Sequence, residues 1–157
     1  MSNNIMLTRI DNRMIHGQVV GQWAGAVSAN LLVVCDDGVA NDALEQSVMR
    51  MAAEAMGYGS RFFSVQKTLD VIEKASPNQK ILLLCKTPES CRRLLEGGLA
   101  LGAVQIGNMH YSEGKKQISQ KAFVSEKELE DLRYISTHCD ELYIQDTPET
   151  AKEKFKG

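Results

Sequence analysis

Four polar side chains with reactive or ligand-binding chemistry occur close together near the start of the sequence. The stretch RIDNRMIHG contains Arg9, Asp11, Arg13 and His16 and ends on a glycine. Arginine can direct two N–H donors at phosphate oxygens, and neutral histidine is a nucleophile that forms covalent intermediates. A hydrophobic core needs none of these groups. The stretch therefore predicts a site that handles phosphate.

The position of His16 supports this prediction. An amphipathic pattern over residues 16–29 predicts a helix that begins at His16. The first amides of a helix have no intrahelical acceptor and carry the positive end of its dipole, so they bind anions and disfavour a cationic imidazole. We expect a neutral His16, with the amides of Met14, Ile15 and Gly17 completing a phosphate cradle. Gly17 leaves room for close approach to the backbone.

The remaining residues of the stretch receive separate roles. Arg13 is the expected phosphate ligand because only two residues separate it from His16, and Arg9 is a second candidate. Asp11 could hold the second ring nitrogen of His16 and fix its tautomer, or could orient an arginine instead. Ile15 is expected in the core. Met14 could be a core anchor or an exposed contact for a protein partner.

Two further loops are candidates for the same region. The segment IGNMHYSEGKKQIS follows an apolar run, so Asn108 and His110 could lie at the rim of the site, although an ordinary solvated loop has the same pattern. The acidic loop DDGVAND, residues 36–42, lacks the alternation and closing Glu of an EF-hand. We read it as a strand-to-helix connection and predict no metal and no cofactor.

Short apolar runs alternate with longer amphipathic segments along the whole chain. The predicted strands are Ile5–Arg9, Leu31–Cys35, Arg61–Val65, Lys80–Cys85, Val104–Gly107 and Leu142–Ile144, and the predicted helices are His16–Ala29, Asp42–Met56, Thr68–Ala75, Pro88–Leu95 and Ser125–Thr137. This alternation predicts an α/β fold: one domain with an open, mostly parallel sheet and helices on both faces. Ligands of such sheets bind at the carboxyl ends of the strands, where residues 9–17 would lie.

Several helix ends and faces can be predicted as well. Asn41 or Asp42, Thr87 followed by Pro88, and Ser125 within SEKE are typical helix-start residues. In the second helix, apolar residues at helical spacing predict a buried face made of Leu44, Val48, Met51, Ala52, Ala55 and Met56. The charged tail, residues 147–157, is predicted to form a short surface helix.

Composition narrows the class of protein. The chain has 157 residues, of which 43% are hydrophobic and 24% charged, which suits one domain with a substantial core. A net charge of -2 argues against a nucleic-acid binder that relies on a general basic field. The sequence has no secretory signal and no run of 18 apolar residues, so work at a membrane would need docking to a partner. Cys35 and Cys85 end apolar runs and no CxxC pair occurs, which favours reduced, buried thiols in a cytoplasmic protein.

The residues then match a known family. RIDNRMIHGQV followed by Trp23 resembles the active-site loop of the IIB subunits of the mannose-type sugar phosphotransferase system, whose pattern is close to R-I-D-x-R-x-I-H-G-Q-V. The similarity continues through DDGVAND and GNMH, so residues 1–157 are expected to form a single IIB domain. NLLVVCDDGVANDALEQSVM and GNMHYSEGKKQIS are most similar to the N-acetylgalactosamine and galactosamine branch. Met14 stands where relatives commonly carry Leu, Val or Phe.

The resemblance implies a function and partners. IIB subunits accept a phosphoryl group from phosphohistidine on a IIA component and pass it to a sugar that enters through the membrane components IIC and IID. The phosphorylated residue of the family falls on His16, with the phosphoryl group on Nδ1, and the conserved loop Arg and Asp fall on Arg13 and Asp11. The implied location is the cytoplasm, peripherally at the inner face of the membrane through IIC and IID. Assembly into a homo-oligomer stays open.

Two other functions remain compatible with the residues. Histidine phosphatases also place a nucleophilic His after the first strand, in an Arg-His-Gly motif, but here Ile15 precedes the His. A non-catalytic module could instead bind phosphorylated ligands or nucleotides at the same loop without a covalent step. No GxGxxG or Walker motif supports the second alternative.

Overall fold

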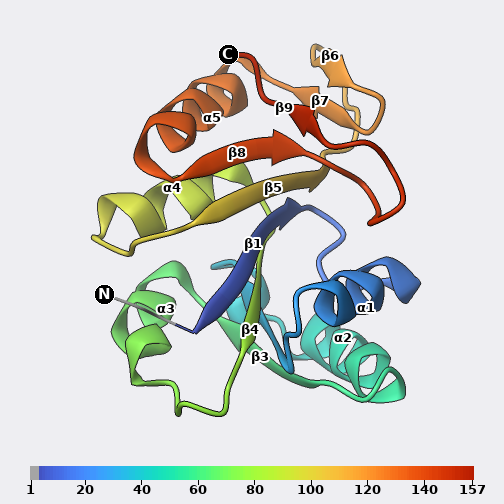
Figure 1. Ribbon diagram of the computed structural model, residues 1–157, viewed down its shortest axis with the longest axis vertical. Coiled ribbons are helices and arrows are strands. Elements are labelled where there is room, and N and C mark those ends of the chain that lie inside the picture. Colours follow the sequence, from blue (N-terminus) through green and yellow to red (C-terminus); the bar gives the residue numbers. More distant parts are fainter. Residues whose placement is uncertain (1–3) are drawn as a thin grey trace.

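A seven-stranded sheet forms the centre of the molecule in the computed structural model, which describes residues 4–157 (Figure 1). The strand order is β3-β2-β4-β1-β5-β8-β9, and all neighbours are parallel except β8 and β9. The strands are β1 (Ile5–Asp11), β2 (Leu31–Cys35), β3 (Gly59–Phe63), β4 (Ile81–Cys85), β5 (Ala103–Asn108), β8 (Glu141–Ile144) and β9 (Glu153–Lys154). A separate antiparallel hairpin joins β6 (Lys116–Ser119) and β7 (Ala122–Val124).

Helices cover both faces of the sheet, as the sequence predicted (Figure 1). The helices are α1 (Gly17–Ala26), α2 (Ala43–Ala55), α3 (Val65–Val71), α4 (Pro88–Glu96) and α5 (Glu126–His138). Apolar residues of α1 and α2 pack on one face, and those of α3, α4 and α5 pack on the other. Strands β2 and β4 are buried along their whole length because both faces are covered, which explains their unbroken apolar runs LLVVC and ILLLC.

Local signals placed the starts of three helices correctly. Asp42 caps α2 by accepting a hydrogen bond from the Glu45 amide, Thr87 caps α4 ahead of Pro88, and Ser125 forms a capping box with Glu128. Each signal works because the capping oxygen satisfies an amide that the helix itself leaves free. Cys35 and Cys85 are buried and form no disulfide, as predicted. No helix within residues 4–157 is long and apolar enough to cross a membrane.

Some predicted elements differ from the structure. The third strand lies two residues earlier than the predicted 61–65, and α3 begins at Val65 because Ser64 caps it. The predicted tail helix is wrong: Glu153 and Lys154 instead extend the sheet as β9 beside β8. The hairpin of β6 and β7 was not predicted. Both additions depend on pairing with a partner strand, which local sequence patterns do not record.

The predicted buried face of α2 is correct only for Ala52 and Met56, which are partly buried against the core. Leu44, Val48 and Met51 form a stripe at helical spacing, yet their side chains are 76%, 61% and 69% exposed. The helix packs on the sheet mainly through Met49 and Ala53, with Ala52 and Met56 partly buried in the same cluster. Apolar residues thus lie on two faces of α2, and the face that contains Met49 and Ala53 is the one that packs on the core.

This arrangement predicts opposite results for two adjacent substitutions in α2. Met49→Ala should lower the free energy of unfolding by about 2–5 kcal/mol because it empties a buried site. Val48→Ala should change it by no more than about 0.5 kcal/mol because that side chain is exposed. Urea unfolding followed by circular dichroism measures both values, and similar losses for the two variants would contradict the observed orientation of α2.

Candidate functional site

Strand β1 brings two charged side chains to the carboxyl edge of the sheet. Arg9 and Asp11 are two residues apart, so both point to the face that α1 covers, whereas Ile10 points into the opposite core. The side chains of Arg9 and Asp11 are fully buried. Burial of single charges is costly, so each must find charged or polar partners nearby.

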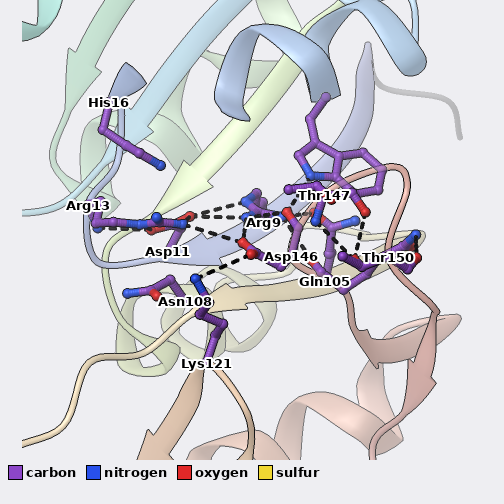
Figure 2. Close-up of polar contacts among 12 residues, drawn as sticks. Arg9, Asp11, Arg13, His16, Gln105, Asn108, Lys121, Asp146, Thr147 and Thr150 are labelled. Atoms are coloured by element: carbon purple, nitrogen blue, oxygen red, sulfur yellow. Dashed lines mark hydrogen bonds and ion pairs between the residues drawn. The ribbon is translucent and has the colours of Figure 1, made fainter. Parts of the chain in front are cut away.

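Arg9 finds partners in three segments of the chain (Figure 2). Its guanidinium donates to the Asp11 carboxylate at 3.2 Å, to the side-chain oxygen of Gln105, and to the backbone carbonyls of Gln145 and Asp146 at 3.0 and 2.9 Å. Burial lowers the pKa of Arg9, and the neighbouring Asp11 carboxylate acts against that shift. The predicted role of Arg9 as a direct phosphate ligand does not fit this burial, because its donors already hold protein oxygens.

Gly107 on β5 makes the path of Arg9 possible. A Cβ atom at this position would lie 2.1 Å from Cζ of Arg9, far inside van der Waals contact. The absence of a side chain at residue 107 thus lets the arginine cross β5 to reach the carbonyls beyond it.

Asp11 orients Arg13, the second of the two roles considered for it. Its carboxylate accepts from Nε and Nη2 of Arg13 at 3.0 and 2.9 Å, and also from the Arg13 backbone amide. The Arg13 side chain is 33% exposed, and no described residue accepts a hydrogen bond from its Nη1. Arg13 therefore has a fixed position and a donor group still available.

His16 is the N-cap residue of α1, as the sequence predicted to within one residue. Its side chain does not cap the helix; Nδ1 lies 3.0 Å from the Met14 carbonyl, and the buried Nε2 has no hydrogen-bond partner among the described residues. Among the described residues no hydrogen bond joins Asp11 to the His16 ring, the other role considered for this carboxylate. Met14 at φ 59° and Gly17 at φ 40° adopt left-handed backbone conformations that shape the turn.

Buried apolar side chains fix this loop on both sides of Arg13 and His16. Met14 and Ile15 are buried in the core beneath α1 and α2, so Met14 is an anchor and not an exposed partner contact. Burial lowers the pKa of His16, and the field of Asp11 partly opposes that shift. The sequence predicted a neutral His16 from the helix dipole, whereas burial is the largest cause in the structure.

Asn108 and His110 reach the loop through Asn12. The Asn108 amide donates to the Asn12 side chain at 3.0 Å, and Asn12 also contacts the His110 ring. The two residues thus lie at the rim, as predicted, without a described contact to His16. In the acidic loop, Asp36 accepts from the Val39 amide and Asp37 binds Arg93. No group of three His, Cys, Asp or Glu side chains within residues 4–157 is placed to hold a metal ion.

Three residues of this region were not predicted from the sequence. Gln105 is a polar residue inside the apolar run of β5, and Asp146 follows the end of β8. Both features can be seen in the sequence and could have indicated residues of the site. Asp146 lies 3.7 Å from both Arg9 and Arg13, and 3.6 Å from Lys121 (Figure 2). Lys121 comes from the hairpin turn, which no local pattern connects to the site.

A parallel α/β sheet with a histidine at a helix start, a fixed arginine beside it and a carboxylate behind them defines a protein equipped to handle an anionic group. Residues 5–157 match the family model of the sorbose-subfamily IIB component of the phosphotransferase system. The chain belongs to this family of phosphotransferase IIB components.

Individual relatives agree with this family. The chain is 54% and 42% identical to the N-acetylgalactosamine-specific phosphotransferase enzyme IIB components 1 and 2 of Escherichia coli, over 98% of each chain in both cases. The crystal structure of the E. coli IIB component 1 superposes with a TM-score of 0.93 at 52% identity, covering 97% of this chain and 99% of that one.

Gly107→Ala should disrupt the Arg9 network. The new methyl group must displace Arg9 or β5, which we expect to lower the free energy of unfolding by about 1–3 kcal/mol. Gly102→Ala, just before the same strand, is the matched control, since its nearest contact is an ordinary 3.8 Å. Thermal unfolding of both variants measures the effect; equal stability would mean that Arg9 does not need the space at residue 107.

His16 should titrate below the ordinary histidine value of about 6.5 because burial disfavours its charged form. The folded-state pKa is thus lower than the unfolded one. The stability contributed by this group is full above about pH 6.5 and is lost as the pH falls through the folded value. Nitrogen-15 NMR should show a midpoint below 6.5 and, above it, a ring protonated at Nδ1. A midpoint above 6.5 would contradict the burial argument.

Proposed function

We propose that residues 1–157 act as a single IIB domain that carries a phosphoryl group on His16. The group is accepted from phosphohistidine on a IIA component and is passed to a sugar during uptake through the membrane components IIC and IID. The observation that carries this proposal is the neutral, half-buried His16 beside Arg13, whose guanidinium is held by Asp11 and still offers a free donor. The working location is the cytoplasmic side of the membrane, through contacts with IIC and IID.

The transfer step needs little from the protein beyond position and charge. The unprotonated ring nitrogen of His16 attacks phosphorus in line, and its P–N bond forms as the P–N bond to the donor imidazole breaks. The electron pair of the broken bond returns to the donor ring, which leaves as a neutral imidazole because its other nitrogen carries a proton. The phosphorylated His16 ring becomes neutral when its second nitrogen releases its proton to solvent. Arg13 neutralises the equatorial oxygens, and the first amides of α1 donate to them. Arg9 supports Asp11 from the interior and keeps Arg13 in place. No cofactor or metal enters this mechanism.

The two ring nitrogens of His16 are not equivalent. With the Met14 carbonyl 3.0 Å from Nδ1, the neutral ring carries its proton there and leaves the lone pair on Nε2. The family resemblance implies a phosphoryl group on Nδ1. Transfer to that atom requires the ring to leave the Met14 carbonyl and move its proton to Nε2, so docking of the donor would have to release this hydrogen bond.

The sugar is proposed to be N-acetylgalactosamine or galactosamine. Support comes from the two E. coli IIB components, which are named as N-acetylgalactosamine-specific and match along almost the whole chain. The sugar is selected mainly by the membrane components, so the IIB domain itself needs no complete sugar pocket.

The two alternatives make different predictions. A histidine phosphatase would release inorganic phosphate to water, and a non-catalytic anion module would never form a covalent adduct. The fixed Arg13 beside His16 favours a site that holds a phosphoryl group in one position. The family membership favours the carrier over both alternatives.

Incubation with phosphoenolpyruvate, enzyme I, HPr and a mannose-type IIA should add one acid-labile phosphoryl group, detected by intact mass spectrometry and phosphorus NMR. His16→Gln should accept none while keeping the wild-type circular dichroism spectrum. Arg13→Ala should accept it at least tenfold more slowly, because a transition-state charge partner is lost.

Each outcome separates the candidate functions. A His16→Gln protein that is phosphorylated at the wild-type rate would remove His16 from the mechanism. Rapid release of inorganic phosphate by the wild type would favour a phosphatase. If active partners produced no adduct at all, the carrier proposal would be wrong and anion binding would remain.

A further inference from the structure

Asp146 is the second carboxylate that faces Arg13, and it comes from the opposite end of the chain. Its backbone carbonyl accepts from Arg9 at 2.9 Å and from Nε1 of Trp23 at 2.8 Å. These two bonds fix residue 146 directly against the β1 and α1 segments (Figure 2). The backbone of residue 146 is therefore fixed without the help of the carboxylate.

The contacts of this carboxylate differ in kind from those of Asp11. Asp11 forms hydrogen bonds of 2.9–3.2 Å with both arginines. By contrast, Oδ1 of Asp146 lies 3.7 Å from Nη2 of Arg9 and of Arg13 and has no described hydrogen-bond partner. Its Oδ2 lies 3.6 Å from Lys121. Asp146 thus acts on the cations through its field more than through hydrogen bonds.

The charged side chains around Asp146 carry a small net positive charge. Three cations, Arg9, Arg13 and Lys121, face two carboxylates, Asp11 and Asp146. The excess is one positive charge. A phosphoryl group on His16 brings up to two negative charges next to Arg13. Without Asp146 the excess would double, and the same phosphoryl group would be held more tightly.

We propose that Asp146 is a positioning residue that sets how strongly His16 holds its phosphoryl group. It partly neutralises Arg13 and so keeps phosphohistidine unstable enough for the group to pass onward. Lys121 moderates this effect by attracting the other carboxylate oxygen. A carrier needs such a balance, because a phosphoryl group bound too tightly would not leave for the next acceptor. The inference rests on the proposed function.

The test is the equilibrium between phosphorylated IIA and this protein. Purified phospho-IIA and the IIB protein are mixed, and the two phosphorylated species are quantified by mass spectrometry. Asp146→Asn keeps the shape and removes the charge, so it should shift the equilibrium toward phosphorylated IIB by about fivefold. Lys121→Met, at a half-exposed side chain, should shift it the opposite way by about twofold or more.

A matched control lies at the start of β8, the strand that Asp146 follows. Glu141 begins β8 and pairs with Lys152 at 2.9 Å, so Glu141→Gln removes the same charge far from His16 and should leave the equilibrium unchanged. A loss of structure at residue 146 would lower phosphorylation, opposite to the predicted gain.

The outcomes distinguish this inference from the proposed function. An unchanged or reduced equilibrium constant in Asp146→Asn, with the wild type phosphorylated, would overturn the role of Asp146 alone. If Asp146→Asn did not fold, an unchanged equilibrium in Lys121→Met would do the same. A wild type that accepts no phosphoryl group from active IIA would overturn both the carrier proposal and this inference.

Discussion

The carboxylate of Asp11 binds two arginines at once, and the geometry of the site depends on this interaction. A buried carboxylate without partners would be strongly destabilising, as would a buried guanidinium. Paired with Arg9 behind and Arg13 in front, Asp11 turns the end of β1 into a rigid support. Arg9 extends that support through β5 to the end of β8, so three strands hold the loop that carries His16.

This support explains why a loop can act as a precise site. The segment from Asn12 to His16, between β1 and α1, has no regular secondary structure, and flexible loops seldom keep two side chains in a productive geometry. Here the loop is fixed by ion pairs on its polar side and by the buried Met14 and Ile15 on its apolar side. Arg13 keeps a donor without a partner among the described residues, and His16 keeps a ring nitrogen without one; both lie where α1 begins.

The two arginines of the site have different roles: Arg9 supports the loop from the interior, whereas Arg13 lies where a phosphoryl group could bind. Arg9 has every feature of a phosphate ligand in the sequence, but in the structure it is an interior brace, and its removal would leave Arg13 as the remaining cation paired with Asp11. The Arg9 guanidinium occupies the space left by Gly107 and donates to the backbone carbonyls that follow β8. Arginine suits both tasks because its donors are rigid and always charged, so residue type alone could not distinguish the brace from the ligand.

The sequence by itself determined the α/β class, most strand and helix positions, and the starts of three helices, because these depend on local periodicity and on capping residues. It also identified the segment of residues 9–17, since reactive residue types occurred together there. The tertiary structure decided which face of α2 is buried, the strand at the tail, and the roles of Arg9 and Asp11. It alone brought Gln105, Lys121 and Asp146 to the site, because residues more than 90 positions away meet Arg9 and Arg13 only when β1, β5 and β8 align at one edge of the sheet. Distance along the chain gives no sign of such contacts; the order of the strands creates them.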